Sequence, residues 1–145
     1  MRLLFLGDVV GISGCSKLTS SLLSEIKLKK IDFVIANGEN AATQGVGLTE
    51  EICKDFYNCG VNVITTGNHV WDQKEIMKYI EKEERLLRPK NLFEPAPGRG
   101  FQIFKTDKNI RVGVLNLMGN VFMKKCEDVF ETSKKFLSEF NLKDD

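Results

Sequence analysis

The chain has 145 residues, which is enough for one domain with a buried core. It carries 21 Lys and Arg against 20 Asp and Glu, so its formal net charge of +1 gives no electrostatic reason to expect nucleic acid or an anionic membrane as its main partner. No apolar stretch approaches the roughly 20 residues of a spanning helix, and the N-terminal apolar run is too short for a signal peptide, so we expect a cytoplasmic protein.

The first half of the sequence predicts alternating strands and helices. Short apolar runs predict buried parallel strands at residues 3–6, 33–36 and 61–66. Apolar residues at helical spacing predict a helix over 16–30. A second helix is predicted to begin after Thr49, a good N-cap residue, and to end before Gly60, which suits the position after a helix.

The second half predicts a different architecture. Asp72 is predicted to cap a third helix, with Glu75 placed for a capping box. A proline-rich loop then leads to two strands, 101–104 and 110–117, which we expect to form an antiparallel hairpin. A final amphipathic helix is predicted over 130–140. The fold class is therefore α/β, with a parallel sheet, crossover helices, and a hairpin.

Each of the three predicted parallel strands is followed by a polar turn that contains glycine. These turns cover residues 7–11, 37–40 and 67–69. Because open α/β sheets collect ligands at the carboxyl ends of their strands, we expect the polar side chains of the turns to converge. The converging side chains are those of Asp8, Glu39, Asn68 and His69. Two carboxylates, an amide and an imidazole at one sheet edge suit hard divalent metal ions.

Taken singly, each of these motifs has an ordinary structural explanation. Asp8 could cap a helix, and residues 37–40 could form a simple polar loop. The glycines after the first strand are spaced G-x-x-x-G-x-x-G, which does not match a dinucleotide-binding loop. His69 is the one histidine of the chain, and an isolated histidine is more often packed or exposed than catalytic. Only the occurrence of all three motifs at successive strand ends favours a site.

The four cysteines do not predict a metal site or a disulfide framework. They are Cys15, Cys53, Cys59 and Cys126, and no two of them form a C-x-x-C pair. We expect free thiols in a reducing compartment, most of them packed as small hydrophobic residues.

Several sequence strings together resemble a known family. The strings GDVVG, ANGENAA, TGNHVWDQKEI, LLRP, PGRGF and LNLMGNVFM resemble the bacterial YmdB-type family of the calcineurin-like metallophosphoesterase superfamily. The resemblance runs from Met1 to about Phe140. It implies half of an α/β/β/α sandwich, and hydrolysis of a small phosphodiester such as a 2′,3′-cyclic nucleotide. It also implies two divalent metal ions, for which we expect Fe or Mn.

The resemblance also implies a role for each candidate residue. Asp8 would ligate one metal, Glu39 would bridge both, and Asn68 would ligate the second. Asn40 would contact the substrate. His69 would act as the general acid or would polarise the phosphate.

Members of that family continue beyond the matched region and bring further histidine ligands. We therefore expect residues 1–145 to form the N-terminal part of a single metallophosphoesterase domain, with a separate C-terminal half as a possible partner. The alternatives are a truncated or split-gene fragment without catalysis, and a nucleotide-binding regulatory module. We expect one sheet face to lack its partner sheet, and the bare apolar surface to make the chain a homo-oligomer.

Overall fold

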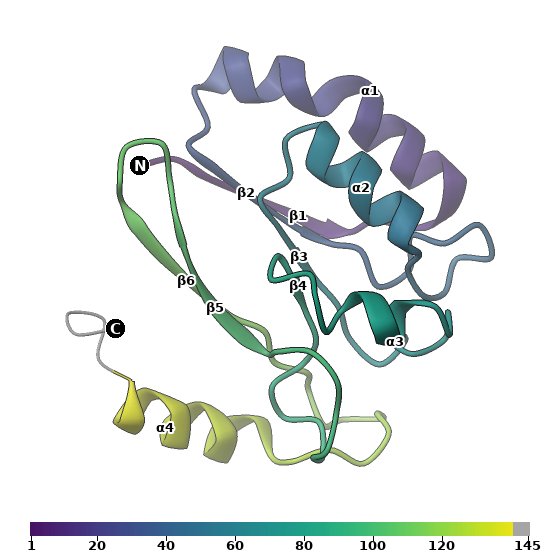
Figure 1. Cartoon of the computed structure of the whole chain (residues 1–145), viewed down its shortest axis with the longest axis vertical. Coiled ribbons are helices and arrows are strands. Elements are labelled where there is room, and N and C mark those ends of the chain that lie inside the picture. The colour runs from purple at the N-terminus through teal and green to yellow at the C-terminus, as the bar shows by residue number, and fades with distance from the viewer. Residues whose placement is uncertain (141–145) are drawn as a thin grey trace.

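The computed structural model describes residues 1–140 and has the predicted α/β architecture (Figure 1). Its elements are β1 (Leu3–Asp8), α1 (Gly11–Lys29), β2 (Phe33–Asn37), α2 (Glu50–Asn58), β3 (Val63–Thr65), α3 (Ile76–Tyr79), β4 (Leu86–Leu87), β5 (Phe101–Lys105), β6 (Arg111–Leu115) and α4 (Val129–Glu139). None of the helices within these residues combines the length and the apolar character needed to cross a membrane.

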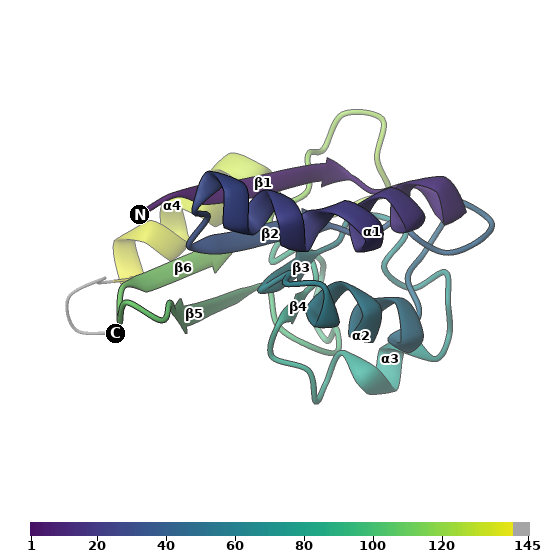
Figure 2. The ribbon, with the colours of Figure 1, turned by 90° about the horizontal axis from the view of Figure 1, so that it is seen from above.

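The first sheet has the order β1-β2-β3-β4, and all its strands are parallel. Figure 2 shows these strands in that order, with β1 at the outer margin of the sheet. One face of the sheet packs against the helices through a core of buried apolar side chains. This core includes Leu18, Leu22, Val34, Phe56, Ile64 and Ile76. Side chains of β2 and β3 that point to the other face are buried as well, which explains why these strands read as continuous apolar runs.

The opposite face of the first sheet is covered by the hairpin of β5 and β6. These two strands pair antiparallel, as predicted, in a separate two-stranded sheet. Its side chains Phe104, Val112 and Val114 pack against residues of β2, β3 and β4. The expectation of a wholly missing partner sheet is therefore wrong, because the chain itself supplies two strands of that layer. The sequence marks the hairpin but does not reveal which sheet face it covers.

Helix α4 forms the outermost layer, beyond the hairpin (Figure 1). Its N-cap is Asp128, whose side chain accepts hydrogen bonds from the backbone of Phe130 and Glu131, both at 2.9 Å. Phe136 packs against Phe101 of β5, with the ring centroids 4.6 Å apart. The predicted final helix is confirmed, and the order of layers is helices, parallel sheet, hairpin and α4.

Two helix boundaries differ in how well the sequence marks them. Helix α1 begins at Gly11, well before residue 16, and its N-cap residue Val10 makes no side-chain capping hydrogen bond. A glycine-rich start without a capping side chain gives no sequence signal for a helix. Helix α2 begins as predicted, because the Thr49 side chain accepts a hydrogen bond from the Ile52 amide at 3.3 Å.

The third helix is much shorter than predicted. Only Ile76–Tyr79 is helical, and the residue before it, Glu75, caps nothing with its side chain. Glu75 instead accepts a hydrogen bond from the Glu50 amide at 3.1 Å. The predicted capping box at Asp72 is therefore wrong, because Glu75 bonds to the start of α2 and the Asp72 carboxylate pairs with His69. Strand β4 was not predicted, and with two residues it is too short to give a periodic signal.

Candidate functional site

The three polar turns lie side by side at the carboxyl edge of the parallel sheet. Asp8 is in register with Asn37 at the end of β2, and Asn37 is in register with Thr65 at the end of β3. This alignment follows from parallel pairing of strands that all end at the same edge. The predicted convergence of the turns is confirmed.

Backbone and side-chain hydrogen bonds tie the first turn to the second. The amide of Val9 donates to the carbonyl of Asn37 at 3.0 Å, and the amide of Gly11 donates to the carbonyl of Asn40 at 2.9 Å. The Nδ2 atom of Asn40 donates to Oδ2 of Asp8 at 2.8 Å. Asn40 therefore fixes the orientation of the exposed Asp8 carboxylate.

Glu39 has the least satisfied polar side chain of the site. Its Oε2 atom is buried and has no hydrogen-bond partner in the protein. Burial raises the pKa of Glu39, and the nearby negative charge of Asp8 raises it further. The backbone amide and the charge of His69 act in the opposite direction on this pKa. An unpartnered buried carboxylate oxygen beside a second carboxylate is the arrangement that a bound cation would stabilise.

Gly67 provides the space into which Glu39 projects. A Cβ atom added at Gly67 would lie 1.9 Å from Oε2 of Glu39 and 2.7 Å from its Cδ. Any side chain at this position would therefore displace the Glu39 carboxylate. Sequence reasoning treats Gly67 only as part of a turn, because this close approach depends on tertiary structure.

His69 is paired with an acidic residue that sequence analysis assigned to another role. Its Nδ1 atom lies 2.6 Å from Oδ2 of Asp72, and both side chains are 34% exposed. Because Asp72 engages Nδ1, the Nε2 atom is the ring nitrogen left for a ligand. Asp72 thus orients His69 and does not cap a helix. The His-x-x-Asp spacing within one turn was the available signal.

Two amides complete the environment of the third turn. Asn68 is half-buried and lies between Gly67 and His69. Asn116, just past the end of β6, is buried and was not among the predicted site residues. Its Nδ2 atom donates to the carbonyls of Thr66 at 2.8 Å and Leu87 at 3.0 Å. Asn116 therefore joins the hairpin layer to the strand ends on which the site is built.

The acidic and imidazole groups of the described residues do not form a complete metal-binding cluster. In residues 1–140, no cluster of three or more His, Cys, Asp or Glu side chains is arranged to hold a metal ion. Asp8 and Glu39 supply two carboxylates to this edge of the sheet, and the second and third turns add the amide side chains of Asn40 and Asn68. Any metal ion held at this edge by residues 1–140 would therefore have two carboxylates and amide groups as its available protein partners.

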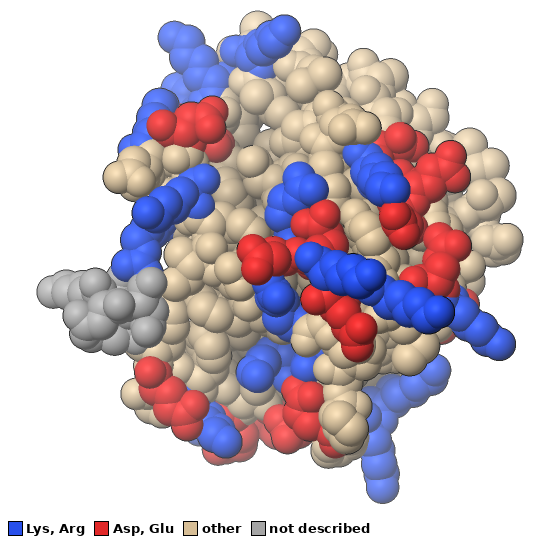
Figure 3. Space-filling view, in the orientation of Figure 1, with Lys and Arg blue, Asp and Glu red and all other residues tan. Residues whose placement is uncertain are grey.

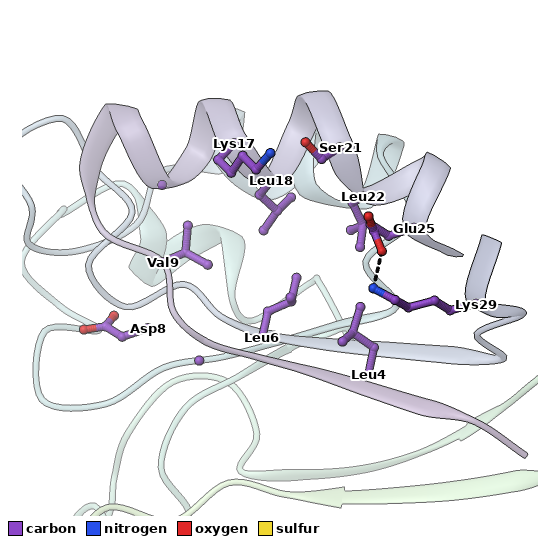
Figure 4. A pocket seen from close by; sticks show the side chains of 12 residues that line it. Leu4, Leu6, Asp8, Val9, Lys17, Leu18, Ser21, Leu22, Glu25 and Lys29 are labelled. Carbon is purple, nitrogen blue, oxygen red and sulfur yellow. Dashed lines mark hydrogen bonds and ion pairs between the residues drawn. The ribbon is translucent and has the colours of Figure 1, made fainter. Parts of the chain in front are cut away.

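The polar site is distinct from the apolar cavity beside it. A cavity of about 570 Å³ lies between β1 and α1, and its walls include Leu4, Leu6 and Leu18. Asp8 stands at one end of this cavity, but its carboxylate turns away from it (Figure 4). On the face seen in Figure 3, acidic and basic side chains are interspersed, so that face has no single-sign patch suited to a polyanion.

Comparisons with known proteins identify relatives along almost the whole chain. The family model described as "YmdB-like protein" matches residues 4–145. A "2′,3′-cyclic-nucleotide 2′-phosphodiesterase" of Bacillus subtilis (strain 168) is 40% identical over 140 residues, covering 96% of this chain and 52% of the relative.

Two solved structures have the same fold over nearly all of the chain. A hypothetical protein from Thermus thermophilus superposes with a TM-score of 0.88 at 35% identity, covering 97% of this chain and 54% of that one. A protein described as a novel phosphatase from Mycoplasma pneumoniae gives 0.87 at 31% identity, covering 97% and 52%. The chain spans about half the length of these relatives. The matched sequence and fold show that the chain belongs to the YmdB-like protein family.

Proposed function

We propose that the protein takes part in metal-dependent hydrolysis of a small phosphodiester, such as a 2′,3′-cyclic nucleotide. The observation that carries this proposal is the buried, unpartnered Oε2 of Glu39 beside Asp8, at the same sheet edge as the His69–Asp72 pair. The names of the B. subtilis and M. pneumoniae relatives, a phosphodiesterase and a phosphatase, support the same reaction class.

Asp8, Glu39 and Asn68 are the residues that would hold the metal ions. Glu39 suits a bridging position because a carboxylate offers two oxygens and its Oε2 has no other partner. Two divalent ions, for which we propose Fe or Mn, would supply Lewis acidity toward water and the phosphate when bound. Binding of cations would also offset the repulsion between the carboxylates of Asp8 and Glu39.

The remaining residues would bind and orient the substrate. His69 would present Nε2 to the phosphate or to the leaving ribose oxygen, while Asp72 accepts a hydrogen bond from Nδ1 and fixes the ring. A proton on Nε2 could then pass to the leaving oxygen. Asn40 holds Asp8 through its Nδ2 atom, and this amide is the group that we assign to substrate contact.

The half-length match bears on whether this chain acts alone. We propose that residues 1–145 are the N-terminal part of a single metallophosphoesterase domain, and that the rest of the domain supplies further metal ligands. The partial ligand set supports this view. The match to only about half of each relative also favours the alternative of a fragment without catalysis. A nucleotide-binding regulatory module would bind ligand without metal or turnover.

Metal titration separates these possibilities. We expect the isolated chain to bind Mn²⁺ weakly and to hydrolyse 2′,3′-cyclic AMP very slowly. Glu39→Gln should abolish the weak Mn²⁺ binding measured by isothermal titration calorimetry. Glu81→Gln, at an exposed position away from the site, is the matched control and should not change it. Binding of Mn²⁺ that is unaffected by Glu39→Gln would contradict the proposed metal site.

A further inference from the structure

The loop of residues 42–47 follows the second turn of the candidate site and leads to α2. Two backbone hydrogen bonds close it, from the amide of Ala42 to the carbonyl of Gly47 at 2.9 Å and from the amide of Gly45 to the carbonyl of Ala42 at 2.7 Å. Gly45 and Gly47 have φ angles of 77° and 80°, which glycine adopts without strain. The loop is therefore a compact unit with a defined shape.

This loop packs against the segment that carries Asp72. The Nε2 atom of Gln73 donates a hydrogen bond to the carbonyl of Val46 at 3.1 Å. A Cβ atom added at Gly47 would lie 2.8 Å from Cγ of Gln73, 3.2 Å from its backbone nitrogen and 3.3 Å from Cβ of Asp72. Because glycine lacks this atom, the loop can lie directly against both residues.

The pair of His69 and Asp72 needs support from outside the pair. Both side chains are 34% exposed, so water competes with the hydrogen bond between Nδ1 and Oδ2. Both residues lie in the irregular segment between the end of β3 and the start of α3. The amide of Asp72 donates to the carbonyl of His69 at 3.1 Å, a bond within that segment. The bond from Gln73 ties the segment to a different part of the chain.

We propose that Gln73 is a positioning residue for His69. By holding its segment against the loop, Gln73 keeps the Asp72 carboxylate within reach of Nδ1, and this contact leaves Nε2 as the ring nitrogen that meets the substrate. The inference rests on the proposed function for the role of Nε2. The positioning itself depends only on contacts within this chain, so it can be measured without metal or turnover.

The single histidine of the chain gives a direct measurement. In a chain labelled with ¹⁵N-histidine and produced without a histidine tag, all imidazole signals come from His69, and they report which ring nitrogen carries the proton. A hydrogen bond from Nδ1 to Asp72 favours the form protonated at Nδ1. At alkaline pH, where an imidazole is neutral, and with a metal chelator present, we expect the unsubstituted chain to be mainly in this form.

A substitution at Gln73 tests the hydrogen bond to the loop. Gln73→Met keeps the length of the side chain but removes the donor to Val46. Without that bond the Asp72 carboxylate is held less firmly, so the fraction of the ring protonated at Nδ1 should fall by roughly half. The matched control is Gln44→Met, because Gln44 is an exposed glutamine of the same loop. It should leave the His69 signals unchanged.

A pair of glycine substitutions tests the packing contact independently. Gly47→Ala places a methyl group against Gln73, whereas Gly45→Ala meets only Cγ1 of Val10, at 3.7 Å. The φ angles of the two glycines are similar, so the backbone strain of the two variants is matched. We expect Gly47→Ala alone to change the His69 signals as Gln73→Met does. Circular dichroism checks the folding of each variant, and the glycine pair decides if Gln73→Met does not fold.

Three results would overturn the proposal. They are an unsubstituted chain whose ring is protonated mainly at Nε2, a folded Gln73→Met variant with unchanged signals, and an equal change in the control variants. The proposed function fails by a different measurement, because Mn²⁺ binding that does not depend on Glu39 would contradict it alone. The histidine signals of the metal-free chain would be unaffected by that result, so the two proposals fail separately.

Discussion

Strands β1 and β2 have similar apolar sequences but very different surroundings. Residues Phe33–Ala36 of β2 are all buried, because neighbouring strands flank β2 and cores lie above and below it. Residues Leu3–Leu6 of β1 alternate between exposed and half-buried. The difference teaches that an apolar run predicts a strand, whereas its burial depends on which strands the rest of the polypeptide places beside it. The candidate site combines residues from both strands, since Asp8 ends the partly exposed β1 and Glu39 follows the buried β2.

The largest effect is expected at the enclosed side of the site, in the turn after β3. In a full-length phosphodiesterase of the kind proposed above, His69→Ala should lower kcat by roughly 100- to 10,000-fold, the usual contribution of a positioned acid or base. The metal content, measured by elemental analysis, should stay the same, because His69 is assigned to the substrate. Loss of one metal ion in this variant would place His69 among the ligands.

The second-largest contrast is expected in the free energy of unfolding, which should fall more for a substitution in β2 than for one in β1. Phe33→Ala removes a fully buried ring and should lower the free energy of unfolding by about 3–5 kcal/mol. Phe5→Ala should cost less than about 1 kcal/mol in the isolated chain, because the Phe5 ring is already largely in water. Urea denaturation of both variants measures the contrast. Equal losses would mean that β1 is as enclosed as β2.

The space beside Glu39 gives a third contrast. Gly67→Ala places a methyl group where Glu39 Oε2 now lies, so it should reduce Mn²⁺ affinity at least tenfold in calorimetric titrations. The control is Gly7→Ala, because nothing lies within 4 Å of a Cβ atom at Gly7. Similar Mn²⁺ affinity in the two variants would show that the buried position of Glu39 does not matter for the metal.

The helix caps should give the smallest difference. Thr49→Ala removes the cap of α2, which carries the buried Phe56, and should lower the free energy of unfolding by about 1 kcal/mol. Asp128→Ala removes the cap of α4, a helix without a buried residue, and should have less effect on global unfolding. Fraying of α4 alone would be visible by hydrogen exchange. A larger loss at Asp128 would show that α4 belongs to the main cooperative unit.

Local patterns predicted most of the fold and the grouping of the site. Apolar runs followed by glycine turns predicted the first three strands, and parallel pairing brings such turns to one edge. The features that the sequence did not predict depend on contacts between distant segments. The close fit of Gly67 to Glu39, the covering of the sheet by the hairpin, and the bonds from Asn116 are of this kind. Asp72 was misassigned because an acidic residue before an apolar stretch suits both a cap and a histidine partner.

One contact gives the site a mechanical link to the hairpin layer. Asn116 follows β6 directly, and its amide holds the carbonyl of Thr66, the residue just before Gly67. A shift of β6 relative to β3 would therefore strain the hydrogen bond to Thr66, which directly precedes the turn of Asn68 and His69. Because the same amide also donates to the carbonyl of Leu87, one side chain fixes β6 against the ends of both β3 and β4.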